Sequence, residues 1–442
     1  MKRPTGFSAF SVIWSGQIAS AIGTRMTAFA LGIWIWDHTG RVLEFALLEF
    51  CSFGATVIFS PVAGALVDRW NRRLTIILSD LGSLAATGVL LLLYTVTSVG
   101  VVELYVVSTV TGAFLAFQYP AYSATITLML ERGHYPRANA MMSLVRNLPY
   151  VAAPALAALL LTFTGIKAIL AIDTLSYALA IGTVFLVAIP KAPGQDGTVA
   201  ASMWRDSLYG FQYIVRRRPL LALLSVSFLV SLIAAITWTV MVPMVLADTG
   251  NSAGQAGLVQ SVGAIGGVLG GVLVGAAGRR SDKMRYVLAA IVCMGVFRIV
   301  YGLADSFWLW SLSLLIGWGT IPVIDGYGQA IWQEKVEPAV QGRVFAAQMF
   351  MENLSLPLAL GVSGVLADRV FGPAMRPQGA LAPVFGHLVG TGRGAGMAVM
   401  CIIGGVLTIV LGVAGYAVPV ARRVETLIPD SEAQAVEVPT ST

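Results

Sequence analysis

The chain has 442 residues, of which 57% are hydrophobic and 11% charged, and its formal net charge is +6. Soluble proteins carry roughly 25% charged residues, so this composition excludes a single water-soluble core and indicates a protein embedded in a bilayer. The cations lie between apolar segments and form no basic face or tail, which argues against a nucleic-acid partner. The three cysteines lie inside apolar segments without metal-ligand or disulfide spacing, and we expect neither a metal nor a cofactor.

Twelve apolar segments are long enough to cross a membrane, which takes about 20 mostly apolar residues as a helix. The first follows Lys2 and Arg3 and runs to Trp36, which is too long for the apolar region of a signal peptide, so we interpret it as a span. The predicted spans are 7–36, 42–67, 74–96, 101–125, 139–162, 166–189, 220–246, 254–277, 286–304, 307–331, 344–371 and 394–418.

A gap separates the sixth and seventh predicted spans. It begins as a Pro/Gly-rich linker and then places Trp204, Leu208, Phe211 and Val215 at helical spacing among charged residues. This pattern predicts an amphipathic helix on the inner leaflet, with a passive connector as the alternative. The predicted organisation is a six-helix half at 1–190, the linker at 191–218, a second six-helix half at 219–424 and a disordered cytoplasmic tail at 425–442.

The two predicted halves resemble each other in sequence. "RNLPYVAAPALAALL" in the fifth span corresponds to "ENLSLPLALGVSGVL" in the eleventh, which pairs Asn147 with Asn353. An internal repeat of about half the chain is typical of two-half secondary transporters.

The loop charges predict the orientation. Most Lys and Arg fall in the segments that face the cytoplasm if the N-terminus does, so an even number of spans places both termini there. One loop predicted to lie outside, 368–393, carries three arginines against this trend. We expect a multi-pass protein of the cytoplasmic membrane of a bacterium.

The hinge between the second and third spans, "GALVDRWNRR", is the most specific motif of the chain. It resembles the signature G-x-L-x-D-R-x-G-R-R of the major facilitator superfamily, except that Asn71 stands where glycine is usual. Asparagine also tolerates a positive φ, so we expect the tight turn to persist. The matching residues are Gly64, Leu66, Asp68, Arg69, Arg72 and Arg73.

The superfamily resemblance implies an all-α integral membrane fold of twelve transmembrane helices in two pseudo-symmetric six-helix halves. "LADRV" after the eleventh span, Asp80 in the third and "YPAYS" in the fourth are similar to the drug and siderophore exporter branch, that of macrolide-efflux and enterobactin-exporter proteins. The resemblance also implies a gate in which Asp68 contacts the nearby arginines and the N-terminus of the eleventh helix. The alternative is that these arginines only fix topology and meet anionic lipid headgroups.

Ionisable residues inside the predicted spans need a reason, because burying a charge in a bilayer is costly. Helix geometry places Arg25 and Glu49 at similar depth, and we predict that they pair and that protonation of Glu49 changes helix packing. A static salt bridge is the open alternative. Glu352 and Asp80 are further candidates for proton coupling, and Arg146, which matches Glu352 in the repeat, is a candidate for attracting an anionic substrate.

The resemblance implies that the first, fourth, seventh and tenth helices line a central cavity. Aromatic faces with sparse amides suit a bulky amphipathic ligand better than a small sugar or an inorganic ion. The cavity candidates, with Asp325 and Arg146 added for their charge, are Trp14, Gln17, Gln118, Tyr119, Trp238, Trp318, Tyr327, Gln329 and Trp332.

We therefore predict a proton-driven exporter of small amphipathic molecules that functions as a monomer. Import of a siderophore or similar metabolite is the alternative in the same fold. A non-transporting receptor or scaffold is disfavoured by the intact hinge motif. An integral-membrane enzyme is disfavoured because the three histidines lie in separate loops.

Overall fold

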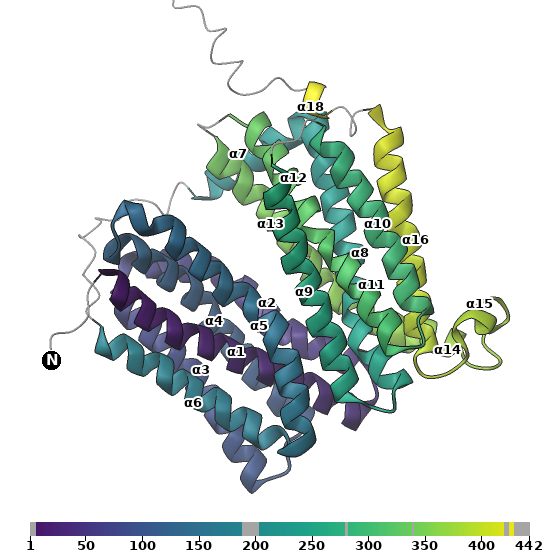
Figure 1. The fold of residues 1–442 in the computed structure, drawn as a ribbon, viewed down its shortest axis with the longest axis horizontal. Helices are drawn as coiled ribbons and strands as arrows, with labels where there is room; N and C mark the ends of the chain where they lie inside the picture. Colours follow the sequence, from purple (N-terminus) through teal and green to yellow (C-terminus); the bar gives the residue numbers. More distant parts are fainter. Residues whose placement is uncertain (1–5, 188–202, 279–281, 338–339, 420–423, 428–442) are drawn as a thin grey trace, which may run out of the picture. The chain divides into compact units, whose positions relative to one another are not determined.

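The computed structural model describes residues 6–187, 203–278, 282–337, 340–419 and 424–427. In these residues the chain is helical, and no strand occurs (Figure 1). It contains 12 helical segments that are long and apolar enough to cross a membrane. The predicted all-α fold with twelve spans is confirmed.

The helices divide between two compact units, each described here by itself. The first comprises residues up to Gly197 together with Thr249–Ser261, and the second comprises Thr198–Asp248 and the chain from Val262 onward. Helix α9 (Ala253–Ala277) therefore begins in the first unit and continues in the second. The other elements of the first unit are α1 (Gly6–Thr39), α2 (Val42–Arg69), α3 (Arg72–Val96), α4 (Val101–Met129), the 3₁₀ turn η1 (Arg132–His134), α5 (Tyr135–Phe163) and α6 (Ile166–Leu186).

The second unit contains several interrupted helices. The tenth span is built from α11 and α12, and the eleventh from α13 and a π-helical segment, η2. Its elements are α7 (Met203–Arg216), α8 (Arg218–Asp248), α10 (Lys283–Leu303), α11 (Phe307–Gly319), α12 (Ile321–Lys335), α13 (Gln341–Val365), η2 (Leu366–Phe371), α14 (Gly372–Ala374), α15 (Ala382–Val389), α16 (Ala395–Ala417) and α18 (Val424–Leu427).

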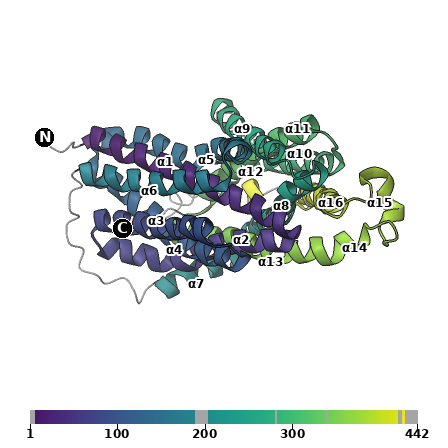
Figure 2. The ribbon, with the colours of Figure 1, turned by 90° about the horizontal axis from the view of Figure 1, so that it is seen from below.

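Small residues let helices of the first unit approach closely. Helix α1 packs against α5 and α6, while α4 packs against α2 and α3 (Figure 2). A Cβ on Gly112 of α4 would lie 2.0 Å from the backbone oxygen of Ser52 on α2, so only glycine fits at this crossing. The Thr56 hydroxyl adds a bond of 2.9 Å to the Gly112 carbonyl. Close packing of this kind is how helices associate where lipid supplies no hydrophobic drive.

The hinge between α2 and α3 differs from the expected positive-φ turn. Asn71 has φ −63° and ψ 112°, and it is the N-cap of α3. Its side-chain oxygen accepts the backbone N–H of Arg73 at 3.1 Å, which satisfies one of the free donors of the first turn. The predicted tight turn therefore persists, with only Trp70 and Asn71 between the two helices, but Asn71 serves it as a helix cap and not through a positive φ.

Helix α7 confirms the predicted helix in the linker but is held by protein contacts. It packs against α13, where a Cβ on Gly210 would lie 2.2 Å from the Arg343 backbone oxygen. Tyr213 and Ile214 are buried in the same cluster as Val344. Tyr213 and Ile214 dock on α13, where Gly210 lets the two backbones meet, while Val215 of the predicted apolar face is exposed. That this helix lies on the inner leaflet stays a prediction.

The beginning of the predicted disordered tail is helical. Glu425 and Leu427 belong to α18, the short helix at the end of the described chain. The rest of that predicted tail, 428–442, lies outside the described residues.

Candidate functional site

A buried carboxylate in the first unit is held by two neutral amides. Asp80 of α3 has no exposed surface, and Gln17 of α1 is 3% exposed. Gln17 Nε2 donates to Asp80 Oδ2 at 2.9 Å, and Gln118 Nε2, from α4, donates to Asp80 Oδ1 at 2.7 Å. Gln118 Nε2 also donates to Gln17 Oε1 at 3.1 Å, so the three side chains form a closed network. We refer to Gln17, Asp80 and Gln118 as the amide–carboxylate network.

The network has no neutralising cation in the part of the chain that the structure describes. No salt bridge there involves Asp80. An unpaired carboxylate is costly to bury, and hydrogen bonds from uncharged amides offset only part of that cost. A side chain in this setting is suited to exchange a proton as its surroundings change.

The sequence had assigned the three members of this network separately. Asp80 was a candidate for proton coupling, whereas Gln17 and Gln118 were candidates for lining a cavity. The structure brings them together because α3 packs on α4 and α1 contacts α4.

A second buried carboxylate in the first unit is Asp173 of α6. It is only 1% exposed and lies within hydrogen-bond distance, 3.3 Å, of the Thr24 hydroxyl, whose oxygen also lies 2.7 Å from the Tyr177 hydroxyl. A Cβ on Gly23 would lie 2.9 Å from Asp173 Oδ1, so the glycine makes room for the carboxylate against α1. The sequence feature that could have indicated this contact is the adjacent Gly23–Thr24 pair. The glycine leaves space for the Asp173 carboxylate, and the threonine hydroxyl lies beside it.

The second unit has its own carboxylate with an amide partner. Gln348 Nε2 donates to Glu352 Oε1 at 3.1 Å and to Gln329 Oε1 at 3.3 Å, which links α13 to α12. Glu352 and Gln329 were predicted site residues, while Gln348, 4% exposed, was missed. Asp325, also on α12, lies within electrostatic range of Glu352.

The predicted Arg25–Glu49 salt bridge is not among those that the described residues form. The Arg25 guanidinium lies over the ring of Tyr150, with 4.2 Å between its central carbon and the ring centroid. A cation over an aromatic face is stabilised by the ring quadrupole, which replaces a direct carboxylate contact. Glu49 contributes only a longer-range attraction. The direct pairing is therefore wrong.

The aromatic cavity candidates have different surroundings. Trp238 and Trp318 lie against each other in the second unit, with ring centroids 4.6 Å apart at 41°. Trp14 Nε1 donates to the Met141 carbonyl at 2.8 Å and joins α1 to α5. Tyr327 and Trp332 are buried in an apolar cluster.

Arg146 and Tyr119 are the two remaining cavity candidates of the first unit. Arg146 is exposed on α5, and the side chain of Tyr119 is outside the described part.

The hinge motif is described only in part. The side chains of Asp68 and Arg69 are outside the described part of the protein, so the gate contact of Asp68 stays a prediction. Leu66 accepts the N–H of Trp70 at the end of α2. Arg73 Nη2 reaches the Phe185 carbonyl at 3.4 Å, which ties the start of α3 to the end of α6.

Comparisons with known proteins agree with this fold. The family described as Major Facilitator Superfamily matches residues 13–360. Macrolide efflux protein A of Streptococcus pyogenes is 27% identical over 364 residues, covering 82% of this chain and 90% of the relative. The multidrug efflux pump Tap of Mycolicibacterium fortuitum is 24% identical over 370 residues, covering 81% of this chain and 88% of the relative.

Solved structures show the same fold. A bacterial homologue of the human lysosomal transporter Spinster, inward-facing and unoccupied, superposes with a TM-score of 0.71 at 15% identity, covering 94% of this chain and 97% of the other. The nucleoside transporter NupG gives a TM-score of 0.69 at 13% identity, covering 92% and 99%. The resemblance predicted from the hinge motif is confirmed by these findings and the family match.

Proposed function

Because the chain belongs to the major facilitator superfamily of membrane transporters, we propose that it exports small amphipathic molecules in exchange for protons, and that Asp80 carries the proton. The single observation that carries the proton assignment is the amide–carboxylate network, in which a fully buried carboxylate is held only by neutral amide donors.

Export and substrate class are supported by the relatives. Those named for macrolide or multidrug efflux align with about four fifths of this chain. The Trp238–Trp318 pair adds large apolar faces within the second unit, as a bulky ligand with few polar groups would require. Import remains the alternative direction, and the experiment below separates the two.

The hydrogen-bond pattern supports exchange of proton and ligand. While both amides donate to ionised Asp80, Gln17 Oε1 accepts from Gln118 Nε2, and the Gln118 oxygen is turned away from the carboxylate and can accept from a donor group of the ligand. Protonated Asp80 must instead donate its O–H, which it can do to Gln118 when that amide turns its oxygen toward the carboxyl group. A ligand donor and the proton therefore compete for the Gln118 oxygen, and such competition is what antiport requires.

The test uses purified protein in proteoliposomes with a radiolabelled macrolide as probe. Antiport predicts that an acidic interior drives accumulation of the probe and that an acidic exterior does not. Asp80→Asn should lower pH-driven accumulation at least tenfold while exchange of labelled for unlabelled probe continues, since exchange needs no net proton movement. Asp80→Glu keeps a titratable carboxyl group and should retain part of the pH-driven accumulation of the probe.

Asp173→Asn is the matched control, because Asp173 is another buried carboxylate of the same unit. The control should leave pH-driven accumulation within about threefold of the parent protein. Full pH-driven accumulation by Asp80→Asn would overturn the proposal that Asp80 carries the proton. Accumulation driven only by an acidic exterior would indicate import.

A further inference from the structure

A small cavity of the first unit lies among helix ends, apart from the amide–carboxylate network. Its volume is about 190 Å³. Its wall residue Trp34 lies about 25 Å beyond Gln17 along α1, at 1.5 Å per residue, so the cavity and the network are separate. We refer to this cavity as the rim pocket, and it is lined by Ala30, Ile33, Trp34 and Asp37 of α1, Tyr94 of α3, Leu161 of α5 and Ile166 of α6.

Two aromatic rings form adjoining walls of the rim pocket. The ring centroids of Trp34 and Tyr94 are 6.4 Å apart, and the ring planes meet at 72°. His38 stacks on Trp34 with 3.9 Å between centroids, and its Nδ1 lies 2.8 Å from the Trp34 carbonyl oxygen, which holds the indole in place. Because His38 is not among the lining residues, the pocket adjoins the part of the indole that His38 leaves uncovered. Two rings nearly at right angles therefore present π surface to one space.

The lining of the rim pocket contains one acidic side chain and no basic one. Asp37 is exposed, and none of the salt bridges that the described residues form involves it. Its electrostatic neighbour is His38. Lys167, which follows the lining residue Ile166, is also exposed and takes no part in those salt bridges. Aromatic faces beside a carboxylate that lacks a salt bridge attract a positively charged ligand.

The helix ends place the rim pocket near the boundary between membrane and water. Helix α1 ends at Thr39, α3 ends at Val96, and α6 begins at Ile166. Tryptophan and tyrosine often occur at this level only as anchors in the interface. An anchor needs neither a cavity nor a carboxylate, whereas Trp34 and Tyr94 enclose a cavity together with Asp37.

The size of the rim pocket limits its ligand to one small group. Pockets for drug-sized ligands measure about 300–1,000 Å³, so a cavity of about 190 Å³ does not enclose such a molecule. The remaining walls are apolar side chains, namely Ala30, Ile33, Leu161 and Ile166. Methyl and methylene groups on a charged nitrogen pack against walls of this kind, while a hydrated inorganic cation gains nothing from them.

We propose that the rim pocket binds a substituted ammonium group, with Asp37 as the counter-charge and Trp34 and Tyr94 as the aromatic walls. Two sources carry this chemistry at the membrane boundary: the headgroup of a lipid, such as ethanolamine, and the amine of a soluble molecule. The pocket is distinct from the network that contains Asp80, so binding there does not depend on the proposed transport activity.

Saturation-transfer NMR of choline with purified full-length protein in detergent micelles tests the proposal. The N-methyl protons of choline should show saturable transfer. The uncharged isostere 3,3-dimethylbutan-1-ol, in which carbon replaces the ammonium nitrogen, should bind at least about fivefold more weakly, because it lacks the charge that the carboxylate and the π faces attract. Equal binding of choline and its isostere would overturn the proposal without any variant.

Substitutions locate the binding. Asp37→Asn, Trp34→Leu and Tyr94→Leu should each weaken choline binding by about fivefold or more. Tyr94→Phe keeps the ring and should bind within about twofold of the parent, which separates the aromatic contact from an effect on folding. The matched controls are Glu103→Gln, a carboxylate at the start of α4, and Trp308→Leu, a tryptophan 78% exposed on α11; both should bind like the parent. Parent-like binding by Asp37→Asn, or equal losses in Asp37→Asn and Glu103→Gln, would overturn the site.

A lipid competition distinguishes the two sources of the ammonium group. Phosphatidylethanolamine is added to the micelles in one series, and diacylglycerol, which has the same tails without the headgroup, in the other. Loss of choline binding with phosphatidylethanolamine alone would support the site and assign it to a lipid headgroup. Choline binding that withstands both lipids would support a soluble ammonium ligand. Equal loss with both lipids would show that the pocket takes acyl chains and would overturn the proposal.

Discussion

Gln118 donates its amide N–H to Asp80 at 2.7 Å, so a residue of α4 holds the buried carboxylate of α3. Helix α4 is one of those that the superfamily resemblance assigns to the cavity. Under the proposed function, a ligand that reaches Gln118 would act directly on the protonation of Asp80.

Replacing Gln118 by Leu should shift the pH dependence of transport. The ionised form of Asp80 loses a charge-assisted hydrogen bond, worth roughly 1.5–3 kcal/mol, while the protonated form loses less. Protonation becomes easier, and at about 1.4 kcal/mol per pH unit the midpoint of pH-driven transport should rise by about one to two units. The measurement is the initial rate of macrolide accumulation over a pH series. A midpoint that stays constant or falls would show that this bond does not control the proton.

The network also marks how far the sequence predicts the site. All three members were identified: Asp80 as an ionisable residue inside an apolar span, and Gln17 and Gln118 as polar residues on helices that the resemblance assigns to the cavity. Their contact was not predicted, since the face that each helix turns to its neighbours depends on packing. Arg25 shows the same limit: its depth relative to Glu49 was used, but rotation about the helix axis brings it over Tyr150 instead.

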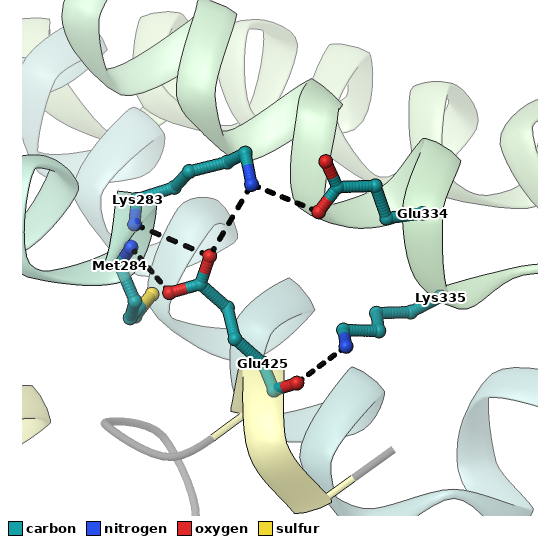
Figure 3. Close-up of polar contacts among 5 residues, drawn as sticks. All are labelled: Lys283, Met284, Glu334, Lys335 and Glu425. Atoms are coloured by element: carbon teal, nitrogen blue, oxygen red, sulfur yellow. Dashed lines mark hydrogen bonds and ion pairs between the residues drawn. The ribbon is translucent and has the colours of Figure 1, made fainter. Parts of the chain in front are cut away.

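The twelve spans were predictable for a simple reason: an apolar run of about 20 residues is a local property of the sequence. The contacts of Glu425 with α10 were not, because Glu425 lies in a polar stretch whose composition alone indicates disorder. Its carboxylate accepts backbone N–H groups of Lys283 and Met284, 142 and 141 residues away in sequence, and no local pattern reveals such a contact (Figure 3).

Glu49→Gln should leave proton coupling largely intact. The sequence suggested that a pairing of Glu49 with Arg25 is proton-sensitive, but Arg25 packs on Tyr150 and makes no salt bridge with Glu49 in the described part of the protein. We expect pH-driven accumulation by Glu49→Gln to stay within about threefold of the parent, in contrast to Asp80→Asn. Measuring both variants in one proteoliposome preparation makes the comparison direct. If Glu49→Gln lost pH-driven accumulation while Asp80→Asn kept it, the proton-coupling role would belong to Glu49 and not to Asp80.

Gly210→Ala should weaken the docking of α7. The added Cβ would lie 2.2 Å from the Arg343 carbonyl oxygen, so the two backbones must separate. Limited trypsin digestion should then cleave faster, by about threefold or more, after Arg216 and Arg217. Gly342→Ala is the control on α13, next to Arg343, since a Cβ there meets nothing within 4 Å. Equal cleavage rates for the two variants would mean that α7 is not held by this contact.

Substitutions of Asn71 distinguish two explanations of the hinge, a helix cap and a turn that needs a positive φ. If the residue caps α3, as its bond to the Arg73 N–H indicates, Asn71→Asp should keep the stability of the protein and Asn71→Ala should cost about 1 kcal/mol. Asn71→Gly should cost only a few tenths of a kcal/mol, because glycine is a tolerated N-cap. If the hinge instead needs a positive φ, glycine is the best residue and aspartate gains nothing from capping. Unfolding of the purified variants in matched detergent, followed by the helical circular dichroism signal, ranks them. The capping role would be contradicted if Asn71→Gly were clearly more stable than the parent protein and Asn71→Asp were no more stable than Asn71→Ala.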